Sequence, residues 1–418
     1  MKDFVYNVSV VDSIREKAGI VSIIGEHVEL SPIGNGYIGK CPFHEDEGQM
    51  LFVNPELNLY SCLDTECGAQ GDAIDFLMRI SGILLNEAVE KAAEKSGISL
   101  EGMKVRTDTE KRAQTVRDIN AEAALVYVHE MMEPQCEAYA YFAGRGLDRK
   151  TMAKFGVGHA PKGAAAYEAV KSKGYSDEAM KDSGLFSFRD DREPRDMFSG
   201  RAVFPVFDGN GEVVGFGGRR MDDSNRKSPK YINSRESVAF DKSRMLYGMH
   251  IAQNTKRDAI ILCEGFMDVI AMHQAGFDSA VASLGTSLTK PQADIIAETA
   301  GKAVIAYDSD DAGQKATGKA IRMLRKAGVA PYVADLSPFK DPDELIRAEG
   351  GKEMAKRIEE AVPADEFEIR IIISRCETLK EADRAFCEMI EPLTEKRADE
   401  CIEIYARLRK KTKKKRST

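Results

Sequence analysis

The sequence lacks the segments that direct a protein into or across a membrane. No N-terminal stretch joins a basic start to an apolar run, and no run of about 18 apolar residues would span a bilayer. The eight cysteines do not suggest a disulfide framework, because three crowd near the N-terminus and the others are scattered through apolar patterns. We therefore expect a soluble, cytoplasmic protein with no membrane partner. A length of 418 residues favours several domains.

Positive charge is also scarce, since 60 Lys and Arg face 68 Asp and Glu and the formal net charge is −8. Taken alone, this balance argues against a nucleic-acid partner, because a DNA-binding surface must offset phosphate charge. The distribution of charge qualifies that conclusion. Residues 215–247 carry eight Lys and Arg against four acids, and residues 407–416 carry eight basic residues and no acid. We expect the second segment to be a disordered tail that binds phosphates.

Hydrophobic periodicity predicts a small β-rich unit followed by a larger α/β part. The N-terminal pattern predicts a helix over 8–25, strands over 26–30, 37–39, 50–53 and 59–61, and helices over 72–81 and 86–96. The charged segment 104–120 is typical of an interdomain linker. Residues 201–220 predict a β-hairpin, and beyond residue 258 strands and helices alternate, which indicates a parallel sheet with crossover helices. The last part of the chain is helical in pattern.

Cysteine and histidine in the N-terminal unit have the spacing of a zinc site. Cys41 and His44 form a C-x2-H pair in KCPFHED, and Cys62 and Cys67 form a C-x4-C pair in YSCLDTECGAQGD. Four soft nitrogen and sulfur donors on tight turns suit tetrahedral zinc, and a closed set of four ligands predicts a structural role. The alternative is two buried cysteine pairs with unrelated polar neighbours, which a domain too small for a large core does not favour.

Carboxylates follow three predicted strands of the α/β part: Glu264 and Asp268, then Asp308 and Asp310, then Asp341 and Asp343. Open α/β sheets bind ligands at the carboxyl ends of their strands. Acids that meet there repel one another unless a cation neutralises them, and hard oxygen ligands suit Mg²⁺ or Mn²⁺. Each acid alone is typical of a solvated turn, but three sets after three strands predict a two-metal site for phosphoryl transfer.

Two glycine motifs do not support nucleotide sites of the usual kinds. Residues 313–320, GQKATGKA, nearly match a phosphate-binding loop, but Ala320 replaces the hydroxyl that would hold magnesium, and the segment follows the acids as a helix. Residues 34–39 match G-x-G-x-x-G, yet they fall between short strands with no helix after them. His273 lies in a helical stretch, and we assign it no role.

A series of segments together identifies a family. KCPFHED, CGAQGDAIDFLMRI, AGRGLDRKTMAKFGVGHAP, RAVFPVFDGNGEVVGFGGRRM, SPKYINSRESVAFDKSRMLYG, CEGFMDVIA, DSDDAG and DPDE occur in that order. On these residues the chain resembles the bacterial DnaG-type primases up to residue 350. The resemblance implies an enzyme that synthesises short RNA primers on single-stranded DNA from ribonucleoside triphosphates. It also implies one structural Zn²⁺ and two or more catalytic Mg²⁺ or Mn²⁺.

The resemblance implies an α/β multidomain fold and assigns roles to residues. The expected parts are a zinc-ribbon-like domain (1–103), a linker (104–120), the N-terminal part of an RNA polymerase core (121–256), a Toprim metal-binding subdomain with a parallel sheet (257–345), a helical subdomain (346–406) and a basic tail (407–418). The implied catalytic acids are Glu264, Asp308 and Asp310, with Asp268, Asp341 and Asp343 as further metal ligands. The implied template- and nucleotide-binding residues are Arg145, Arg201, Arg219, Lys230, Asn233 and Lys242. Tyr231 or Phe240 offers a ring for stacking, and Glu264 acts as a metal ligand, a proton acceptor or both.

Two features depart from the family pattern. The second cysteine pair is C-x4-C where the family usually has C-x2-C, which makes Cys67 the least certain zinc ligand. The chain stops near the end of the helical part of the core, so we expect no C-terminal domain to bind a DnaB-type replicative helicase, which puts that partner in doubt. We expect a monomer. A compact primase of a phage or mobile element is one interpretation of the short chain. The competing functions are a Toprim-type nuclease or topoisomerase and a non-catalytic, zinc-dependent DNA-binding protein.

Overall fold

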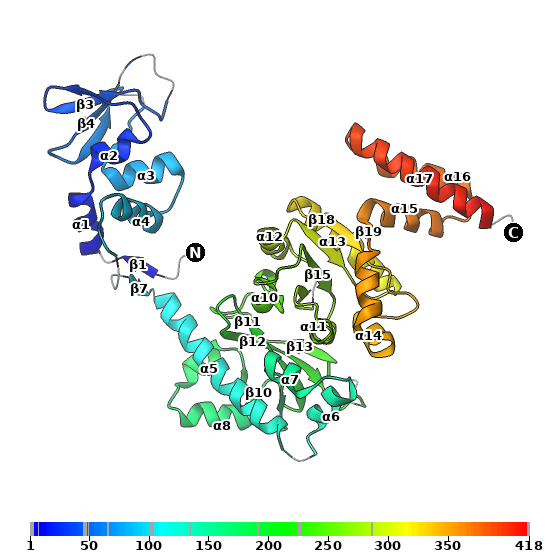
Figure 1. Cartoon of the computed structure of the whole chain (residues 1–418). Coiled ribbons are helices and arrows are strands. Elements are labelled where there is room, and N and C mark those ends of the chain that lie inside the picture. The colour runs from blue at the N-terminus through cyan, green and yellow to red at the C-terminus, as the bar shows by residue number, and fades with distance from the viewer. Residues whose placement is uncertain are drawn as a thin grey trace. The chain divides into compact units, whose positions relative to one another are not determined.

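The computed structural model describes residues 4–6, 8–44, 48, 50–64, 67–100, 104–106, 108–133, 135–189, 192–224, 228–285 and 287–415 (Figure 1). The chain divides into two compact units, residues 1–112 and 113–418. Within the described ranges, no helix combines the length and the apolar character needed to cross a bilayer.

Unit 1 combines a five-stranded antiparallel sheet with helices that cover its buried face. Its elements are β1 (Phe4–Tyr6), α1 (Val8–Lys17), α2 (Ile20–Gly25), β2 (Ser31–Ile33), β3 (Gly36–Gly39), β4 (Leu51–Asn54), β5 (Leu59–Cys62), β6 (Gln70–Gly71), α3 (Ala73–Ser81), α4 (Leu85–Lys95) and β7 (Lys104–Arg106). Strands β2 to β6 form a meander in chain order, and β1 pairs with β7. Three rings, Phe43, Tyr60 and Phe76, pack edge-on or tilted at the centre of its core.

The sequence placed most of these elements correctly but missed two details. The helical pattern over 8–25 is broken into α1 and α2 near Gly19. The strand expected over 26–30 is wrong, because the first strand of the meander is β2, at Ser31–Ile33. Val28 is buried in the core although it lies outside any strand, so alternation of apolar residues here reflects burial without strand pairing.

The first part of unit 2 is a four-stranded antiparallel sheet with helices around it. Its elements are α5 (Asp108–Met131), α6 (Glu137–Gly144), α7 (Arg149–Phe155), β8 (Gly158–Ala160), α8 (Ala165–Ser172), α9 (Asp177–Asp182), β9 (Phe186–Arg189), β10 (Arg192–Asp196), β11 (Arg201–Phe207), β12 (Val213–Arg220), β13 (Tyr231–Asn233) and the 3₁₀ turn η1 (Lys242–Arg244). The sheet order is β13-β12-β11-β8. The hairpin β11-β12 confirms the prediction over 201–220. In β12, a Cβ added to Gly217 would come within 2.3 Å of the Phe266 ring, so glycine allows the sheet to pack closely there.

The second part of unit 2 is an α/β layer built on a six-stranded sheet. Its elements are β14 (Leu246–Tyr247), α10 (Met249–Ala252), β15 (Ala259–Cys263), α11 (Phe266–Gln274), β16 (Ala280–Ser283), α12 (Lys290–Thr299), β17 (Lys302–Ile305), α13 (Asp311–Lys326), β18 (Ala330–Val333), α14 (Pro342–Glu359) and β19 (Val362–Pro363). The strand order is β14-β16-β15-β17-β18-β19. The four inner strands are parallel as predicted, whereas the edge strands β14 and β19 are antiparallel.

The chain ends in a cluster of three helices, α15 (Ala364–Arg375), α16 (Leu379–Ile390) and α17 (Glu395–Lys415) (Figure 1). They share a small core in which the rings of Phe386 and Tyr405 stack at 4.1 Å. The expected disordered tail is wrong for residues 407–415, because α17 continues through them. Ion pairs help to explain this continuation: Arg407 contacts Glu366, and Arg409 makes a two-pronged contact with Asp383.

The charged segment 104–120, predicted as a linker, is regular where it is described. Residues 104–106 form β7, and α5 begins at Asp108. The division between the two units falls within this segment, after residue 112. Its charges therefore lie on a helix surface in the part beyond Asp108, and high charge density alone did not distinguish a solvated helix from a loop.

One buried carboxyl group ties α8 to β10. The Asp196 side chain is 4% exposed, and its two oxygens accept hydrogen bonds from the backbone N–H groups of Ala166 and Tyr167, both at 2.9 Å. These donors lie in the first turn of α8, where N–H groups have no partner within the helix. Burial nevertheless raises the pKa of Asp196 to about 6, because it disfavours the charged form.

Asp196 should make unit 2 less stable as the pH rises. The pKa is higher in the folded state than in the unfolded state, so its contribution is fully present below about pH 4 and is lost as the pH passes through about 6, by about 3 kcal/mol in all. Asp196→Asn cannot titrate. The free energies of unfolding of the variant and of wild type are measured by urea denaturation from pH 4 to 7. The value for the variant minus the value for wild type should rise by roughly that amount across the interval, because only wild type loses the contribution of Asp196.

The exposed Glu178→Gln is the matched control for Asp196→Asn, and its profile should run parallel to that of wild type. A parallel profile for Asp196→Asn as well would contradict the raised pKa.

Candidate active site and metal centre

The four predicted zinc ligands meet in unit 1. One donor atom from each of Cys41, His44, Cys62 and Cys67 lies within 4.8 Å of the other three. Cys41 follows β3, Cys62 ends β5 and Cys67 precedes β6, so the meander brings the two pairs together. Cys67, the ligand that the C-x4-C spacing made least certain, has its Sγ 3.9 Å from that of Cys41. This approaches the roughly 3.8 Å edge of a tetrahedron with Zn–S bonds of about 2.3 Å.

The donor set fits zinc in its orientation and in its chemistry. The Nε2 atom of His44 lies 3.2 Å from Cys62 Sγ, while Nδ1 faces Asp64 at 3.9 Å, so a carboxylate stands behind the coordinating ring. Burial raises the pKa of the Cys41 thiol to about 12 and also raises the pKa of Cys62. Thiolates at these positions therefore need a cation beside them, and metal binding would release protons.

The predicted acids of unit 2 come from the ends of three neighbouring strands. Glu264 directly follows β15, Asp308 follows β17, and Asp341 follows the connection after β18. The backbone N–H of Asp308 donates to Glu264 Oε1 at 3.2 Å, which fixes the two strand ends to each other. Close packing holds the turn after Asp308, since a Cβ on Gly313 would lie 2.0 Å from the carbonyl oxygen of Asp308.

The acidic site concentrates negative charge. Burial raises the pKa of Glu264 and of Asp308, and neighbouring carboxylates add to both shifts: Asp308 and Asp310 for Glu264, and Asp341 and Asp310 for Asp308. Burial also raises the pKa of Asp268 well above its ordinary value, with Asp341 and Asp308 adding to the effect. Mutual repulsion of this kind is relieved by a divalent cation. The oxygen donors fit Mg²⁺ or Mn²⁺ in type, although among the described residues only the Cys and His set forms a compact group of ligands.

The predicted acids differ in what they contact. Glu264, Asp268, Asp308 and Asp341 line a cavity of about 770 Å³, whereas Asp310 and Asp343 do not. Asp310 caps α13 by accepting from the Gly313 N–H at 2.9 Å. Asp268 caps α11 through the N–H of Gly265 at 3.1 Å. Asp341 caps α14, so three of the six acids have a helix N-terminus to stabilise their charge.

Asp343 is fully buried and faces arginines instead of the cavity. Its Oδ2 lies 2.5 Å from Arg145 Nη2 and 3.0 Å from Arg347 Nε. Arg145, predicted to bind template or nucleotide, lines the cavity but is held by this ion pair. The ion pair between Arg145 and Asp343 joins the C-terminal end of α6 to the first turn of α14. This geometry supports a positioning role for Asp343 and no direct metal contact.

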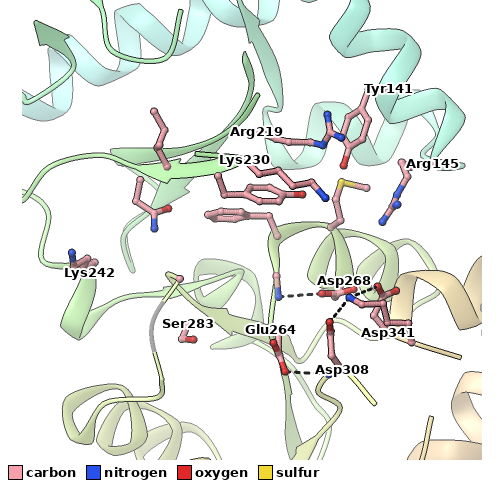
Figure 2. A pocket seen from close by; sticks show the side chains of 18 of the residues that line it. Tyr141, Arg145, Arg219, Lys230, Lys242, Glu264, Asp268, Ser283, Asp308 and Asp341 are labelled. Carbon is pink, nitrogen blue, oxygen red and sulfur yellow. Dashed lines mark hydrogen bonds and ion pairs between the residues drawn. The ribbon is translucent and has the colours of Figure 1, made fainter. Parts of the chain in front are cut away.

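Basic and aromatic side chains lie across the cavity from the acids (Figure 2). Arg219, Lys230, Asn233 and Lys242, which were predicted to bind template or nucleotide, all line it. The Arg219 guanidinium lies 4.4 Å from the centre of the Tyr141 ring and donates to Asp223 at 2.8 Å. Its Nη1 donates to the backbone oxygen of Arg220 at 2.8 Å, so Arg219, which is 9% exposed, is fixed at the edge of the cavity.

Arg201 and Phe240 do not reach the cavity. Arg201 is buried, and its guanidinium donates to the backbone oxygens of Gly218, Lys230 and Pro229 and to the Ser228 hydroxyl. It therefore supports the segment that presents Lys230, and its guanidinium is engaged by the protein itself. Phe240 is 1% exposed and packs in the core, whereas Tyr231 is 41% exposed and lines the cavity. Of the two proposed stacking rings, only Tyr231 is available.

Tyr141 and Lys340 are among the cavity residues that sequence reasoning missed. Lys340 Nζ contacts Asp308 Oδ2 and lies 3.8 Å from Asp341 Oδ2, so it faces two of the acids. Asp308 raises the pKa of Lys340 through this contact. A signal for Lys340 was present, because it directly precedes Asp341 in FKDPDE. Tyr141 gave no such signal, because its neighbours in the sequence, Ala140 and Phe142, are apolar and suggest only a packed helix.

Comparison with known proteins identifies three parts of the chain. The family profile described as CHC2 zinc finger matches residues 6–108, the DNA primase catalytic core N-terminal domain matches residues 126–253, and a Toprim-like domain matches residues 261–346. The DNA primase of Clostridium acetobutylicum is 36% identical over 364 residues, or 86% of this chain and 60% of that protein. The DNA primase of Aquifex aeolicus is 34% identical over 378 residues, or 90% of this chain and 73% of that protein.

Solved structures agree with the sequence comparison. The Aquifex aeolicus primase, with its zinc-binding and RNA polymerase domains, has a TM-score of 0.61 and 32% identity, covering 95% of this chain and 96% of that chain. A DnaG primase catalytic domain bound to ssDNA has a TM-score of 0.57 and 31% identity, covering 64% and 85%. The chain spans 60% of the Clostridium protein's length. Over that length, it belongs to the family of bacterial DnaG-type DNA primases.

Proposed function

We propose that the chain is a DNA primase that synthesises short RNA primers on single-stranded DNA. One observation carries the proposal: carboxylates from three adjacent strand ends face Arg219 and Lys230 across a single cavity (Figure 2). A cavity with acids on one wall and cations on the other suits a nucleoside triphosphate whose phosphates meet metal ions and arginine together. A relative of this chain was solved with ssDNA bound, which supports the same kind of template.

In this proposal the 3′-hydroxyl of the primer attacks the α-phosphate of an incoming ribonucleotide, and pyrophosphate leaves. Glu264, Asp308 and Asp341 would hold two or more Mg²⁺ or Mn²⁺, which when bound would stabilise the attacking and leaving oxygens. Asp310 lies outside the cavity lining and shapes the start of α13 from there. Glu264 is placed either to hold a cation or to accept the hydroxyl proton.

The basic wall positions the reactants. Lys230, which directly precedes β13, offers a point charge for a phosphate. Arg219 offers a guanidinium charge that Tyr141 and Asp223 hold in place. Tyr231 presents a ring on which a base can stack. Holding the 3′-hydroxyl and the α-phosphate together in this way lowers the barrier without covalent help from the protein.

Asp308→Asn should abolish primer synthesis. The substitution removes one negative charge where three strand ends meet, so incorporation of labelled ribonucleotides on single-stranded DNA with Mg²⁺ or Mn²⁺ should fall roughly a hundredfold or more, as expected for losing several kcal/mol of charge stabilisation. Asp311→Asn is the matched control, because Asp311 is exposed and lies outside the cavity.

Three results would count against the primase proposal. They are equal activity of Asp308→Asn and wild type, cleavage of DNA in place of RNA synthesis, and no product from folded protein loaded with zinc. The second result would favour a nuclease or topoisomerase, and the third a DNA-binding protein without catalysis.

Cys67→Ser should lose the single zinc ion of unit 1. A hydroxyl is a poor replacement for a thiolate, and a site with three remaining protein ligands is open to water, so elemental analysis should find well under one zinc per chain. The four ligands connect β3, β5 and β6, so unit 1 should also become sensitive to proteolysis. The exposed Cys387→Ser is the control and should keep a full equivalent. Full zinc content in Cys67→Ser would remove Cys67 from the ligand set.

A further inference from the structure

Unit 2 contains a second groove, which lies between α13 and the C-terminal helices. Its volume is about 540 Å³, and its apolar lining comes from α15 and α16. Phe367, Ile371 and Ile372 of α15 form most of that lining, with Met389 of α16 beside them. None of these residues lines the cavity that holds the acids. The groove therefore has no part in the proposed chemical step.

Cations line both walls of this groove. Lys315, Lys319 and Arg322 recur at positions i, i+4 and i+7 of α13, so they share one face of the helix, and all three are exposed. Arg375 comes from α15 and donates to the side chain of Gln314 at 3.2 Å. The one acid of the lining, Glu368, is neutralised by Arg325 at 2.9 Å. The groove is therefore positively charged in a chain whose net charge is −8.

The near match to a phosphate-binding loop in residues 313–320 has its explanation here. The segment is helical within α13, so it cannot wrap its backbone N–H groups around a phosphate as a loop does. The helix instead turns Lys315 and Lys319 of that motif toward the groove. The lysines that the sequence pattern singled out remain without a role in the acidic cavity.

The groove adjoins a cavity that one of the predicted acids, Asp308, also lines. An adjoining cavity of about 400 Å³ is lined by Asp308 and Ser309 at one end. Gln314, Phe367 and Ile371 line both this cavity and the groove, so the two meet along α13 and α15. Asp308 in turn lines both the smaller cavity and the acidic cavity, so the cations of α13 lie on the side of the smaller cavity away from the other acids.

We propose that the groove between α13 and α15 binds the sugar–phosphate backbone of a nucleic-acid strand that extends beyond the catalytic cavity, a proposal that rests on the proposed function. Seven residues of helix separate Lys315 from Arg322, which is about 10 Å along the axis and enough to face two or more successive phosphates. This spacing favours a strand over a free nucleotide. Phe367 is half-buried and lines the groove, which gives a base an aromatic side chain to contact.

The test compares two triple variants that remove the same charge. Lys315→Gln, Lys319→Gln and Arg322→Gln are combined in one protein, and Lys256→Gln, Lys352→Gln and Lys356→Gln in the other. The control lysines are exposed and line neither the groove nor the adjoining cavity. Binding of single-stranded DNA of increasing length is measured by fluorescence anisotropy at several salt concentrations, after thermal unfolding has shown both proteins to be folded.

The groove variant should bind long oligonucleotides roughly tenfold or more weakly than the control variant. The slope of log K against log salt concentration should be less negative by about two, as expected for the loss of three phosphate contacts to a single strand. The difference should disappear for oligonucleotides too short to leave the catalytic cavity. Equal affinities of the two triple variants for long DNA would overturn the proposal.

A second arm separates a strand from a free nucleotide and the groove from the proposed function. Calorimetric titration with ATP should give equal affinities for both triple variants. A loss confined to ATP would overturn the proposal, since the groove would then be a nucleotide site. If wild-type protein makes no RNA, the primase proposal fails, yet the DNA affinities of the two variants still decide whether the groove binds a strand.

Discussion

Repulsion between carboxylates at one edge of a sheet is the constraint on which the larger unit depends. Neighbouring strands β15, β17 and β18 end together, so Glu264, Asp308 and Asp341 must lie close to one another. Burial raises the pKa of Glu264 and Asp308, which shows that the folded state resists full ionisation there. A fold tolerates this arrangement only if other groups stabilise the negative charge. The same arrangement makes the edge a strong site for cations.

Three features of the fold stabilise that charge without filling the cavity. Asp268, Asp310 and Asp341 each cap a helix, so backbone N–H groups and helix dipoles offset part of the repulsion. Lys340 contacts Asp308 directly. Arg145 and Arg347 enclose Asp343, which anchors the start of α14 beneath the acids. Much of the apparent redundancy among the six acids is therefore structural, and a smaller group is left facing the cavity.

The sequence predicted what depends on local pattern and spacing. The hairpin over 201–220 and the parallel strands beyond residue 258 form as predicted, and the four predicted zinc ligands meet although the second pair has unusual spacing. Predictions failed where tertiary contacts decide. Arg201 has the composition of a phosphate ligand, but its burial against backbone carbonyls shows that it supports the chain around Lys230. Nothing in the residue's immediate sequence neighbours distinguishes these two uses of arginine.

The prediction of a disordered basic tail was wrong for a related reason. Blocks of like charge usually remain disordered because they repel one another. Here Arg407 and Arg409 each contact an acid from another helix, and Tyr405 stacks on Phe386, so the helix extends past them. Pairing partners more than 20 residues away in the sequence cannot be recognised from the block itself.

Net charge is a poor guide to the proposed nucleic-acid partner for a physical reason. At physiological ionic strength, interactions between exposed charges are largely screened beyond about 8 Å. A phosphate in the catalytic cavity is therefore governed by Arg219, Lys230 and the nearby acids, and distant surface carboxylates have little influence on it. Acidic residues spread over the rest of the surface leave such local positive regions intact. The arrangement of charges along β12, β13 and α13, and not their sum, determines where a polyanion can bind.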